Sequence, residues 1–287
     1  MRGDAARSFG TSIVVDVGTS AVKAACILET GDVTSQAEVA LAPPSGRGGW
    51  AEQEPVDWER ASQIAIRDVV AQGTQPPDRL ILTGQMQDLT LTDAVGRPLR
   101  PSILYSDTRA QDEVEEVLRT LGVETVAAWT GNETDASSLL AKSLWVKRHA
   151  AEAWEASSHV FLGAADYLAF RLTGTAVCDV TTASTTGLMG LEGRAFLHAD
   201  WAAKLGLEAL LGRLPRLAAG GERVGTVRPE MADAWGVPAG LPVHVAPGDA
   251  AATTIGAGAG EPGVASLYLG TSGWLAFTST TRGRPEA

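Results

Sequence analysis

The sequence is poor in the residues that crosslink proteins or bind transition metals. Its 287 residues include only two cysteines, Cys26 and Cys178, and four histidines, none of them at metal-ligand spacing. This argues against a disulfide-stapled secreted domain, and we predict that both cysteines are reduced core residues. No apolar run approaches the roughly 18 residues that a membrane span needs, and the first residues lack a signal-peptide pattern. We therefore expect a cytoplasmic protein without a membrane partner.

Positive charge is also scarce. The 23 lysines and arginines are outnumbered by 34 aspartates and glutamates, which gives a formal net charge of −11. This balance argues against a nucleic-acid partner. It leaves a phosphorylated small molecule open, because a local cluster of backbone N–H groups and a metal ion bind phosphate even on an acidic protein.

Several common nucleotide-binding and hydrolase motifs are missing as well. The chain has no P-loop ending in Gly-Lys-Ser/Thr and no Gly-x-Ser-x-Gly nucleophile turn. The stretch from Gly258 to Gly263 formally fits a dinucleotide-binding pattern. It contains Pro262 and precedes a predicted strand, however, whereas that pattern must open a helix.

What is present is a strand, an acid and a small turn near the start of the chain. Ile13 to Val15 predict a buried strand that delivers Asp16 and is followed by a turn with the sequence Gly18, Thr19, Ser20. Such a turn brings backbone N–H groups close to an anion, and the carboxylate suits Mg²⁺. Lys23, on the returning strand, adds a positive charge. The alternative is an ordinary hairpin turn.

The same pattern returns in the last quarter of the chain. A strand over 264–269 enters a second turn, Gly270, Thr271, Ser272 and Gly273, and a further strand follows over 274–278. Just upstream, a strand over 243–246 leads into Pro247-Gly248-Asp249 and a helix over 250–258. Two facing Gly-Thr-Ser turns would clamp a polyphosphate from both sides. For Asp249, the residue types allow a helix cap, a reactive carboxylate, or both.

Two segments between these turns carry side chains that are able to contact a ligand. A strand over 80–82 runs into Gln85, Met86 and Gln87, and another precedes Asp107 and Arg109. Asp107 lies at a strand-to-helix junction, where it either caps the helix or presents its carboxylate to a ligand hydroxyl. Helices are predicted from Pro55 to Gly73 and over 139–149 and 165–172, and only short helices and breaks over 200–235.

These motifs, taken in order, resemble the amino-terminal domain of the FGGY family of carbohydrate kinases, and most closely its xylulokinases. The resemblance runs from Ile13 to about Thr280 and rests on the order and separation of eight segments. They are Asp16–Lys23, Trp50–Trp58, Gly84–Met86, Ile103–Arg109, Lys142–His149, Asp166–Leu168, Gly248–Ala250 and Leu269–Gly273.

The resemblance implies an actin/hexokinase-like fold, in which a ribonuclease-H-like α/β domain has a mixed five-stranded sheet with flanking helices. It implies ATP and Mg²⁺ as cofactors and a small sugar or polyol as substrate. By position, Asp249 matches the family's catalytic base and a metal contact, and Asp16 matches the other Mg²⁺ residue. The two Gly-Thr-Ser turns, together with Lys23, match the phosphate-binding segments. Gln85, Met86, Gln87, Asp107 and Arg109 match sugar-binding segments.

Two positions depart from the xylulokinase pattern. Gln87 stands where these enzymes usually have His, and Ala250 where they usually have Asn. Gln still exchanges hydrogen bonds with hydroxyls, whereas Ala does not. The sequence therefore predicts a pentulose or related polyol without identifying it.

The resemblance also predicts how the chain is divided. We expect a disordered stretch over 1–10, a kinase domain over 11–280, and over 281–287 the start of a hinge to a second domain. Kinase activity from this chain alone is then expected to be weak or absent. Its partner is either a second copy or a chain that supplies the complementing carboxy-terminal domain. The alternative is a non-catalytic relic that keeps sugar or phosphate binding.

Overall fold

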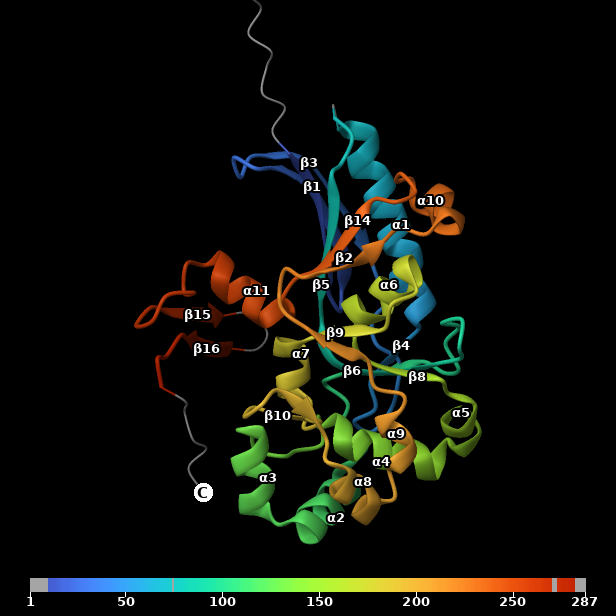
Figure 1. Ribbon diagram of the computed structural model, residues 1–287, viewed down its shortest axis with the longest axis vertical. Helices are drawn as coiled ribbons and strands as arrows, with labels where there is room; N and C mark the ends of the chain where they lie inside the picture. The colour runs from blue at the N-terminus through green and yellow to red at the C-terminus, as the bar shows by residue number, and fades with distance from the viewer. Residues whose placement is uncertain (1–9, 74, 270–272, 282–287) are drawn as a thin grey trace, which may run out of the picture.

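The structure is a computed structural model that describes residues 10–73, 75–269 and 273–281 (Figure 1). The predictions made for the N-terminal tail, for Gly270, Thr271 and Ser272, and for the hinge beyond residue 281 lie outside the described residues. None of the helices in the described part of the chain combines the length and the hydropathy needed to cross a membrane.

A mixed six-stranded sheet forms the centre of the protein (Figure 1). In sheet order, its strands are β13 (Arg223–Thr226), β14 (Pro242–Val245), β5 (Arg79–Gly84), β1 (Thr11–Val17), β2 (Ala21–Leu28) and β3 (Val33–Ala40). β5 runs parallel to both β1 and β14, while the other neighbours are antiparallel. The C-terminal ends of β1, β5 and β14 therefore share one edge of the sheet, which is where Asp16 and Asp249 occur in sequence.

The α/β class with a mixed sheet is confirmed, but the sheet has six strands where five were predicted. The additional strand is β13, in a stretch expected to hold only short helices and breaks. Its four residues include Gly225 and pair with β14 through an irregular register. So short a strand shows too little apolar alternation to be recognised from sequence.

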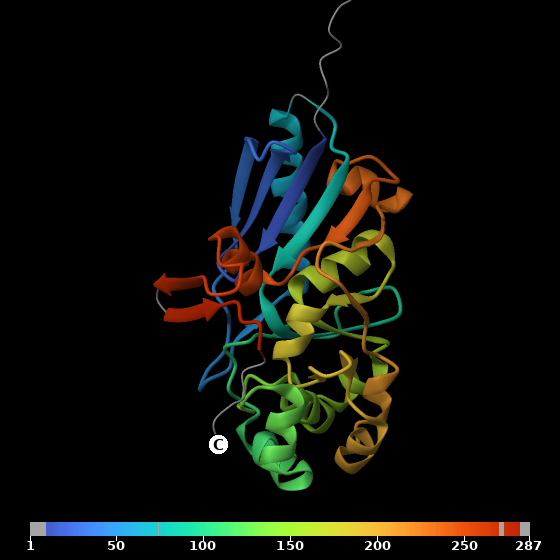
Figure 2. The same cartoon turned by 60° about the vertical axis from the view of Figure 1, so that its left-hand side comes forward.

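Two helices cover one face of the central sheet. Alternate residues of β1, namely Ile13, Val15 and Val17, are almost fully buried and pack with α1 (Pro55–Gln72) and α6 (Ala164–Thr173) in one hydrophobic core. This period of two is what a half-covered strand requires. The intervening residues Val14 and Asp16 lie on the opposite face and are partly exposed. Figure 2 shows the sheet in front of α1.

A second sheet and a group of helices form the other half of the fold, in the lower part of Figure 1. The strands, in sheet order, are β4 (Glu52–Gln53), β7 (Ser102–Ile103), β6 (Met86–Thr92) and β8 (His159–Gly163). The helices packed around this half are α2 (Gln111–Leu121), α3 (Val123–Thr130), α4 (Leu139–His149), α5 (Ala151–Ala156), α8 (Ala199–Leu205) and α9 (Glu208–Leu211). The chain crosses from the central sheet to this sheet at Gln85, between β5 and β6.

Several smaller elements complete the two halves. They are β9 (Val177–Asp179) paired with β12 (Arg216–Ala218), α7 (Val180–Thr185), β10 (Met189–Gly190) paired with β11 (Ala195–Phe196), and α10 (Pro229–Trp235). Several predicted boundaries are confirmed: α1 has Pro55 in its first turn and ends at Gly73, α4 spans the predicted residues, and α6 ends at Gly174 in the left-handed conformation.

The last elements lie on the opposite side of the central sheet from α1 and α6 (Figure 1). They are α11 (Asp249–Gly256) and the antiparallel pair β15 (Ala265–Leu269) and β16 (Gly273–Phe277). Among the described residues this pair forms a sheet of its own, and every residue of α11 is at least partly exposed. Leu269 is 78% exposed and Phe277 65%. This surface is far more apolar and open than the rest of the fold.

Candidate functional site

Asp16 is presented at the end of β1, on the sheet face that α1 and α6 leave open. Its Oδ1 is buried and has no hydrogen-bond partner among the described residues. Burial raises the pKa of Asp16, an effect that the nearby charge of Lys23 partly opposes. Lys23 is exposed and lies opposite Asp16 in the β1–β2 register, and both residues line a hollow of ≈ 510 Å³ on this face. The predicted neighbours are thus brought together.

The Gly18–Ser20 turn is fixed from behind by buried amides. Gly18 N donates to Ala21 O at 3.1 Å, which closes the turn. The Thr19 hydroxyl donates to Gln85 Oε1 at 2.9 Å, and Gln53 Nε2 donates to Thr19 O at 2.8 Å. The Thr19 side chain is therefore held inside the protein, while Ser20 is exposed.

Gln85 was predicted to bind sugar, and the structure gives it a different setting. The residue is 2% exposed, its Oε1 accepts from Thr19, and its Nε2 donates to Gln53 Oε1 at 3.3 Å. Gln53 Oε1 also accepts from Trp58 Nε1 at 3.1 Å. These bonds make Gln85 part of a buried chain that supports the Gly18–Ser20 turn.

Asp249 follows β14 and is the first residue of α11. The N-cap of that helix is Gly248, and no side chain caps it, so the cap interpretation of Asp249 is not realised. Asp249 Oδ1 accepts from Ala250 N at 2.7 Å. The pKa of Asp249 is raised to about 6, mainly by burial and further by the charge of Asp16, while the bond from Ala250 N opposes the rise.

Asp16 and Asp249 together fit a hard divalent cation. Each pKa is raised above its usual value by burial, and the two carboxylates repel each other across the shared edge of the sheet. The unpartnered Oδ1 of Asp16 is the kind of oxygen ligand that Mg²⁺ takes alongside water. A cation between them would relieve both the repulsion and the missing partner.

Met86 and its neighbours connect the Asp249 turn to the rest of the site. A Cβ atom added at Gly248 would lie 2.5 Å from Met86 Cγ and 2.6 Å from Thr182 Oγ1. The turn before Asp249 therefore rests directly on β6 and on α7. Met86 is 8% exposed, so the structure places it beneath the turn and leaves little of its side chain accessible.

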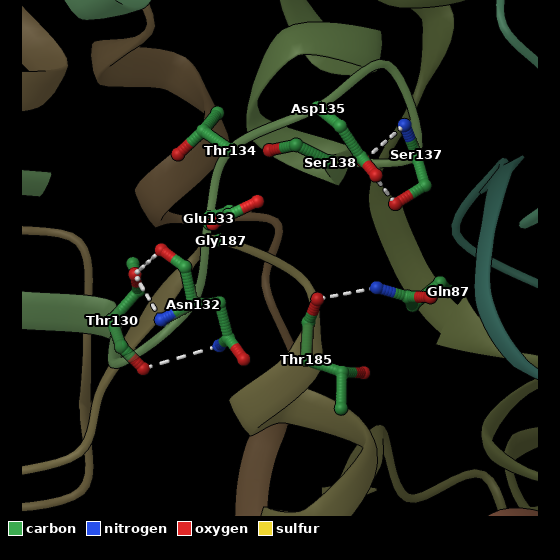
Figure 3. Close-up of a pocket in the computed structure, with 10 residues that line it drawn as sticks. All are labelled: Gln87, Thr130, Asn132, Glu133, Thr134, Asp135, Ser137, Ser138, Thr185 and Gly187. Atoms are coloured by element: carbon green, nitrogen blue, oxygen red, sulfur yellow. Dashed lines mark hydrogen bonds between the residues drawn. The ribbon is translucent and has the colours of Figure 1, made fainter. Parts of the chain in front are cut away.

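Gln87 lines a polar cavity of ≈ 300 Å³ that extends away from this turn (Figure 3). Its backbone is in the left-handed region, with φ 61°, and its Nε2 donates to the carbonyl of Thr185 at the end of α7. The other lining residues come mainly from the loop between α3 and α4, and nearly all of them carry hydroxyl, amide or carboxylate groups: Thr130, Asn132, Glu133, Thr134, Asp135, Ser137, Ser138 and Gly187. Such a lining suits a ligand rich in hydroxyls.

Asp107 and Arg109 are buried and bound to each other. Arg109 Nε donates to Asp107 Oδ1 at 2.9 Å and Nη2 to Oδ2 at 2.6 Å, while Nη1 lies 2.7 Å from Glu52 Oε1. The guanidinium carbon of Arg109 also lies 3.8 Å from the ring centroid of Trp50 and 4.8 Å from that of Trp145, and the two rings meet edge to face. Asp107 is fully buried, and Arg109's side chain is 1% exposed.

These contacts correct one of the two interpretations of Asp107. The N-cap of α2 is Ala110, so Asp107 does not cap that helix. Asp107 also accepts from Ala51 N at 2.5 Å, so its oxygens are engaged by protein groups, and its contact with a sugar stays a prediction. The Arg109 guanidinium lies over the Trp50 ring, while Trp50 is 46% exposed.

Two buried residues that interact electrostatically, Asp88 and Lys142, were not predicted. Asp88 is fully buried, with Oδ1 accepting from Tyr105 N at 3.2 Å and Oδ2 without a partner. Lys142 is also fully buried and donates to Leu104 O at 2.7 Å. Burial lowers the pKa of Lys142 to about 8, which Asp88 opposes, and burial raises the pKa of Asp88 well above its usual range.

The loop over 130–138 was also missed. Its sequence is a run of polar residues without a local pattern that predicts a role. Asn132 Nδ2 donates to Thr130 O at 3.1 Å and to Ser184 O at 2.8 Å, so its amide ties the loop to α7 (Figure 3). The role of this loop depends on tertiary neighbours that no local pattern reveals.

Comparison with known proteins gives one consistent result. A family model described as the N-terminal domain of the FGGY family of carbohydrate kinases matches residues 11–256. Xylulose kinase from Escherichia coli K12 is 34% identical over 279 residues, which are 96% of this chain and 56% of that protein. Xylulose kinase from Streptomyces coelicolor is 33% identical over 272 residues, 93% of this chain and 54% of that protein.

Solved structures agree in fold. The crystal structure of xylulose kinase from Rhodospirillum rubrum superposes with a TM-score of 0.89 at 29% identity, covering 96% of this chain and 56% of that one. Gluconate kinase from Lactobacillus acidophilus gives a TM-score of 0.86 at 24% identity, over 93% of this chain and 54% of that one, which is a likeness of fold. The chain thus spans about half the length of the relatives that it matches.

Proposed function

Because the chain belongs to the FGGY family of carbohydrate kinases, we propose that it is the sugar-binding half of an ATP-dependent kinase that acts on a pentulose or a related polyol. The xylulose kinases among its relatives support this substrate class. Gln87 and Ala250, which depart from the xylulokinase pattern, leave the individual sugar open.

Asp249 is the proposed general base, and its pKa is the observation that carries the proposal. A base with a pKa of about 6 is ionised at neutral pH yet holds a proton more readily than an ordinary aspartate. Phosphoryl transfer requires mainly alignment and charge neutralisation, with one carboxylate to take the proton of the attacking hydroxyl. Asp249 follows β14, at the same edge of the central sheet as Asp16, and the turn before it rests on Met86, the neighbour of Gln87.

Asp16 and Asp249 would hold Mg²⁺, which neutralises phosphate charge when it is bound. The exposed Ser20 would bind phosphate oxygens through its hydroxyl and N–H groups, together with the backbone of the turn at Gly18 and Thr19. Lys23 would add a positive charge from β2. The second turn, Gly270 to Gly273, is proposed for the same role from its sequence. We assign Gln85 to the support of the first turn and the Asp107–Arg109 pair to the wall of the site.

The nucleotide side of the site is proposed to come from a second domain. The family match ends at residue 256, the relatives are about twice as long, and β15, β16 and α11 leave their apolar side chains open. We propose that β15 and β16 belong to this second domain, so that the first domain ends near α11. The full ATP site then needs a complementing carboxy-terminal domain.

Two measurements test the proposal. Isothermal titration of the chain with pentuloses and polyols is expected to identify a ligand, whose affinity falls in Gln87→Ala. Coupled ADP release is expected to be weak or absent for the chain alone and to appear when the carboxy-terminal half of a xylulose kinase relative is supplied. Asp249→Asn is the matched variant, expected to bind sugar without turnover. Robust turnover by the chain alone would refute the need for a second domain.

A non-catalytic sugar-binding relic is the second candidate, favoured by Ala250, which has no side-chain group for a sugar hydroxyl. In that case the complemented chain binds sugar but releases no ADP, and Asp249→Asn changes neither result. Loss of turnover in Asp249→Asn from an active complemented enzyme would exclude it.

A further inference from the structure

The turn that carries Asp249 is held from two different parts of the fold. From β5, the Thr83 hydroxyl donates to Pro247 O at 2.7 Å. From the end of β9, Asp179 Oδ1 accepts from Gly248 N at 3.4 Å, in a buried setting. The first bond fixes where β14 ends. The second acts on the peptide immediately before Asp249.

Asp179 is itself fixed by the helix that it begins. It is the N-cap of α7, and its Oδ1 accepts from Thr181 N at 2.9 Å and from Thr182 N at 3.1 Å. The side chain of Thr182 abuts Gly248, because a Cβ atom there would lie 2.6 Å from Thr182 Oγ1. One carboxylate oxygen therefore ties the first turn of α7 to the Gly248 peptide. Because the two segments also pack directly against each other, a shift of one is expected to move the other.

Asp166 supports this arrangement from α6. The ligand atoms of Asp166, Cys178 and Asp179 lie within 4.8 Å of one another, and all three residues are buried. Burial, and then the charge of Asp179, raises the pKa of Asp166 well above its usual range. The buried carboxyl group of Asp166 thus lies beside Asp179 at the start of α7.

We propose that Asp179 is a positioning residue for Asp249: by holding Gly248 N, it sets the direction in which the Asp249 side chain leaves the turn. The proposal deepens the proposed function, since it takes Asp249 as the base. Asp179 touches neither sugar nor phosphate and acts only through the Gly248 peptide.

The four methionines of the chain provide the test. Methyl-labelled methionine NMR of the 287-residue chain gives separate reporters: Met86 lies against Gly248, Met189 in β10 follows α7, and Met231 in α10 is remote from both. In Asp179→Ala we expect the Met86 signal to shift and hydrogen exchange at the Gly248 amide to accelerate about tenfold, as loss of a charge-assisted bond predicts. The Met231 signal is expected to stay in place.

The conservative variant separates positioning from capping. Asp179→Asn keeps an acceptor oxygen but loses its charge, so its effects on Met86 and Gly248 should be intermediate. If only Met189 moves, Asp179 is merely the cap of α7 and the proposal is overturned. Should Asp179→Ala not fold, Asp179→Asn alone decides, because an unchanged Gly248 exchange rate in that variant contradicts the proposal. Neither sugar nor nucleotide is used, so these results are independent of whether the chain proves to be a kinase.

Discussion

The charge of Asp16 raises the pKa of Asp249, although β5 separates β1, which carries Asp16, from β14, which precedes Asp249. Burial is the larger cause of the same rise. The two carboxylates are thus electrostatically coupled without any direct bond, which is the arrangement expected of residues that share a cation or a phosphate.

Removing the charge of Asp16 should lower the pKa of Asp249. In Asp16→Asn we expect the Asp249 carboxyl to titrate below about 6 but still above its ordinary value of 3.8, because burial remains. Carbon-13 NMR of aspartate-labelled chain measures this directly. Asp93→Asn, in an exposed turn, is the matched control and should leave Asp249 unchanged. An Asp249 pKa that does not move in Asp16→Asn would contradict the coupling.

The raised pKa of Asp249 also predicts how pH acts on stability and on Mg²⁺ binding. The folded chain holds the Asp249 proton more tightly than the unfolded chain, so this contribution to stability is present below pH 3.8 and lost as pH rises through about 6. Mg²⁺ competes with that proton, and its affinity should therefore increase up to about pH 6 and then level off. Titration calorimetry from pH 5 to 8 would show it. Asp249→Asn should flatten the profile.

Lys142 predicts the opposite trend in alkaline solution. Its pKa is lowered from 10.5 to about 8, so between these values the unfolded chain binds a proton that the folded chain does not. Stability against urea should therefore rise with pH across this window relative to Lys142→Met. Lys204→Met, at an exposed position of α8, should keep the wild-type slope. Equal slopes in wild type and Lys142→Met would show that the lysine is not held in a desolvated site.

Arg109→Lys should destabilise the fold, although the substitution keeps the positive charge. Lysine loses the paired bonds to Asp107 and the contacts of the guanidinium with the rings of Trp50 and Trp145. We expect a loss of about 2 kcal/mol in the free energy of unfolding. Arg97→Lys is the control, since Arg97 pairs with Asp93 while 76% of its side chain is exposed, and it should change little. Urea denaturation measures both. A loss of sugar affinity without a loss of stability would instead favour direct contact with the ligand.

Gly248→Ala should disturb the Asp249 turn through its Cβ atom. That atom would overlap Met86 and Thr182, and we expect a loss of about 1–3 kcal/mol in stability. Gly256→Ala, later in α11, meets no neighbour within 4 Å and should be neutral or slightly stabilising. Thermal unfolding of the two variants provides the comparison. Equal melting temperatures in the two variants would show that the turn accommodates the added Cβ atom without loss of stability.

Much of the fold follows from local pattern. Three features can be predicted because each reflects a local requirement of the backbone. They are the period of two in β1, the proline in the first turn of α1 and the glycine after α6. Asp16 and Asp249 were also found this way, since each follows an apolar strand and meets a glycine turn. These features depend on neighbours a few residues away.

The sequence did not predict the contacts of residues whose partners lie far along the chain. Asp107 accepts from Ala51 N, and Gln85 accepts from Thr19, so two side chains predicted to face a sugar are already engaged. Asp88 in β6 and Lys142 in α4 are buried and interact electrostatically, and the sequence of neither element predicts this interaction. A motif indicates which polar groups are present; the fold decides which of them remain free to meet a ligand.

The open hairpin of β15 and β16 has a consequence for handling the protein. A two-stranded sheet has two edges with unpaired backbone groups, and here the side chains between them include Leu267, Leu269, Leu275 and Phe277, each more than 60% exposed. Edges of this kind template pairing with other chains. In isolation, the chain should therefore self-associate as its concentration rises, and lysine substitutions at Leu267 and Leu275 should keep it monomeric.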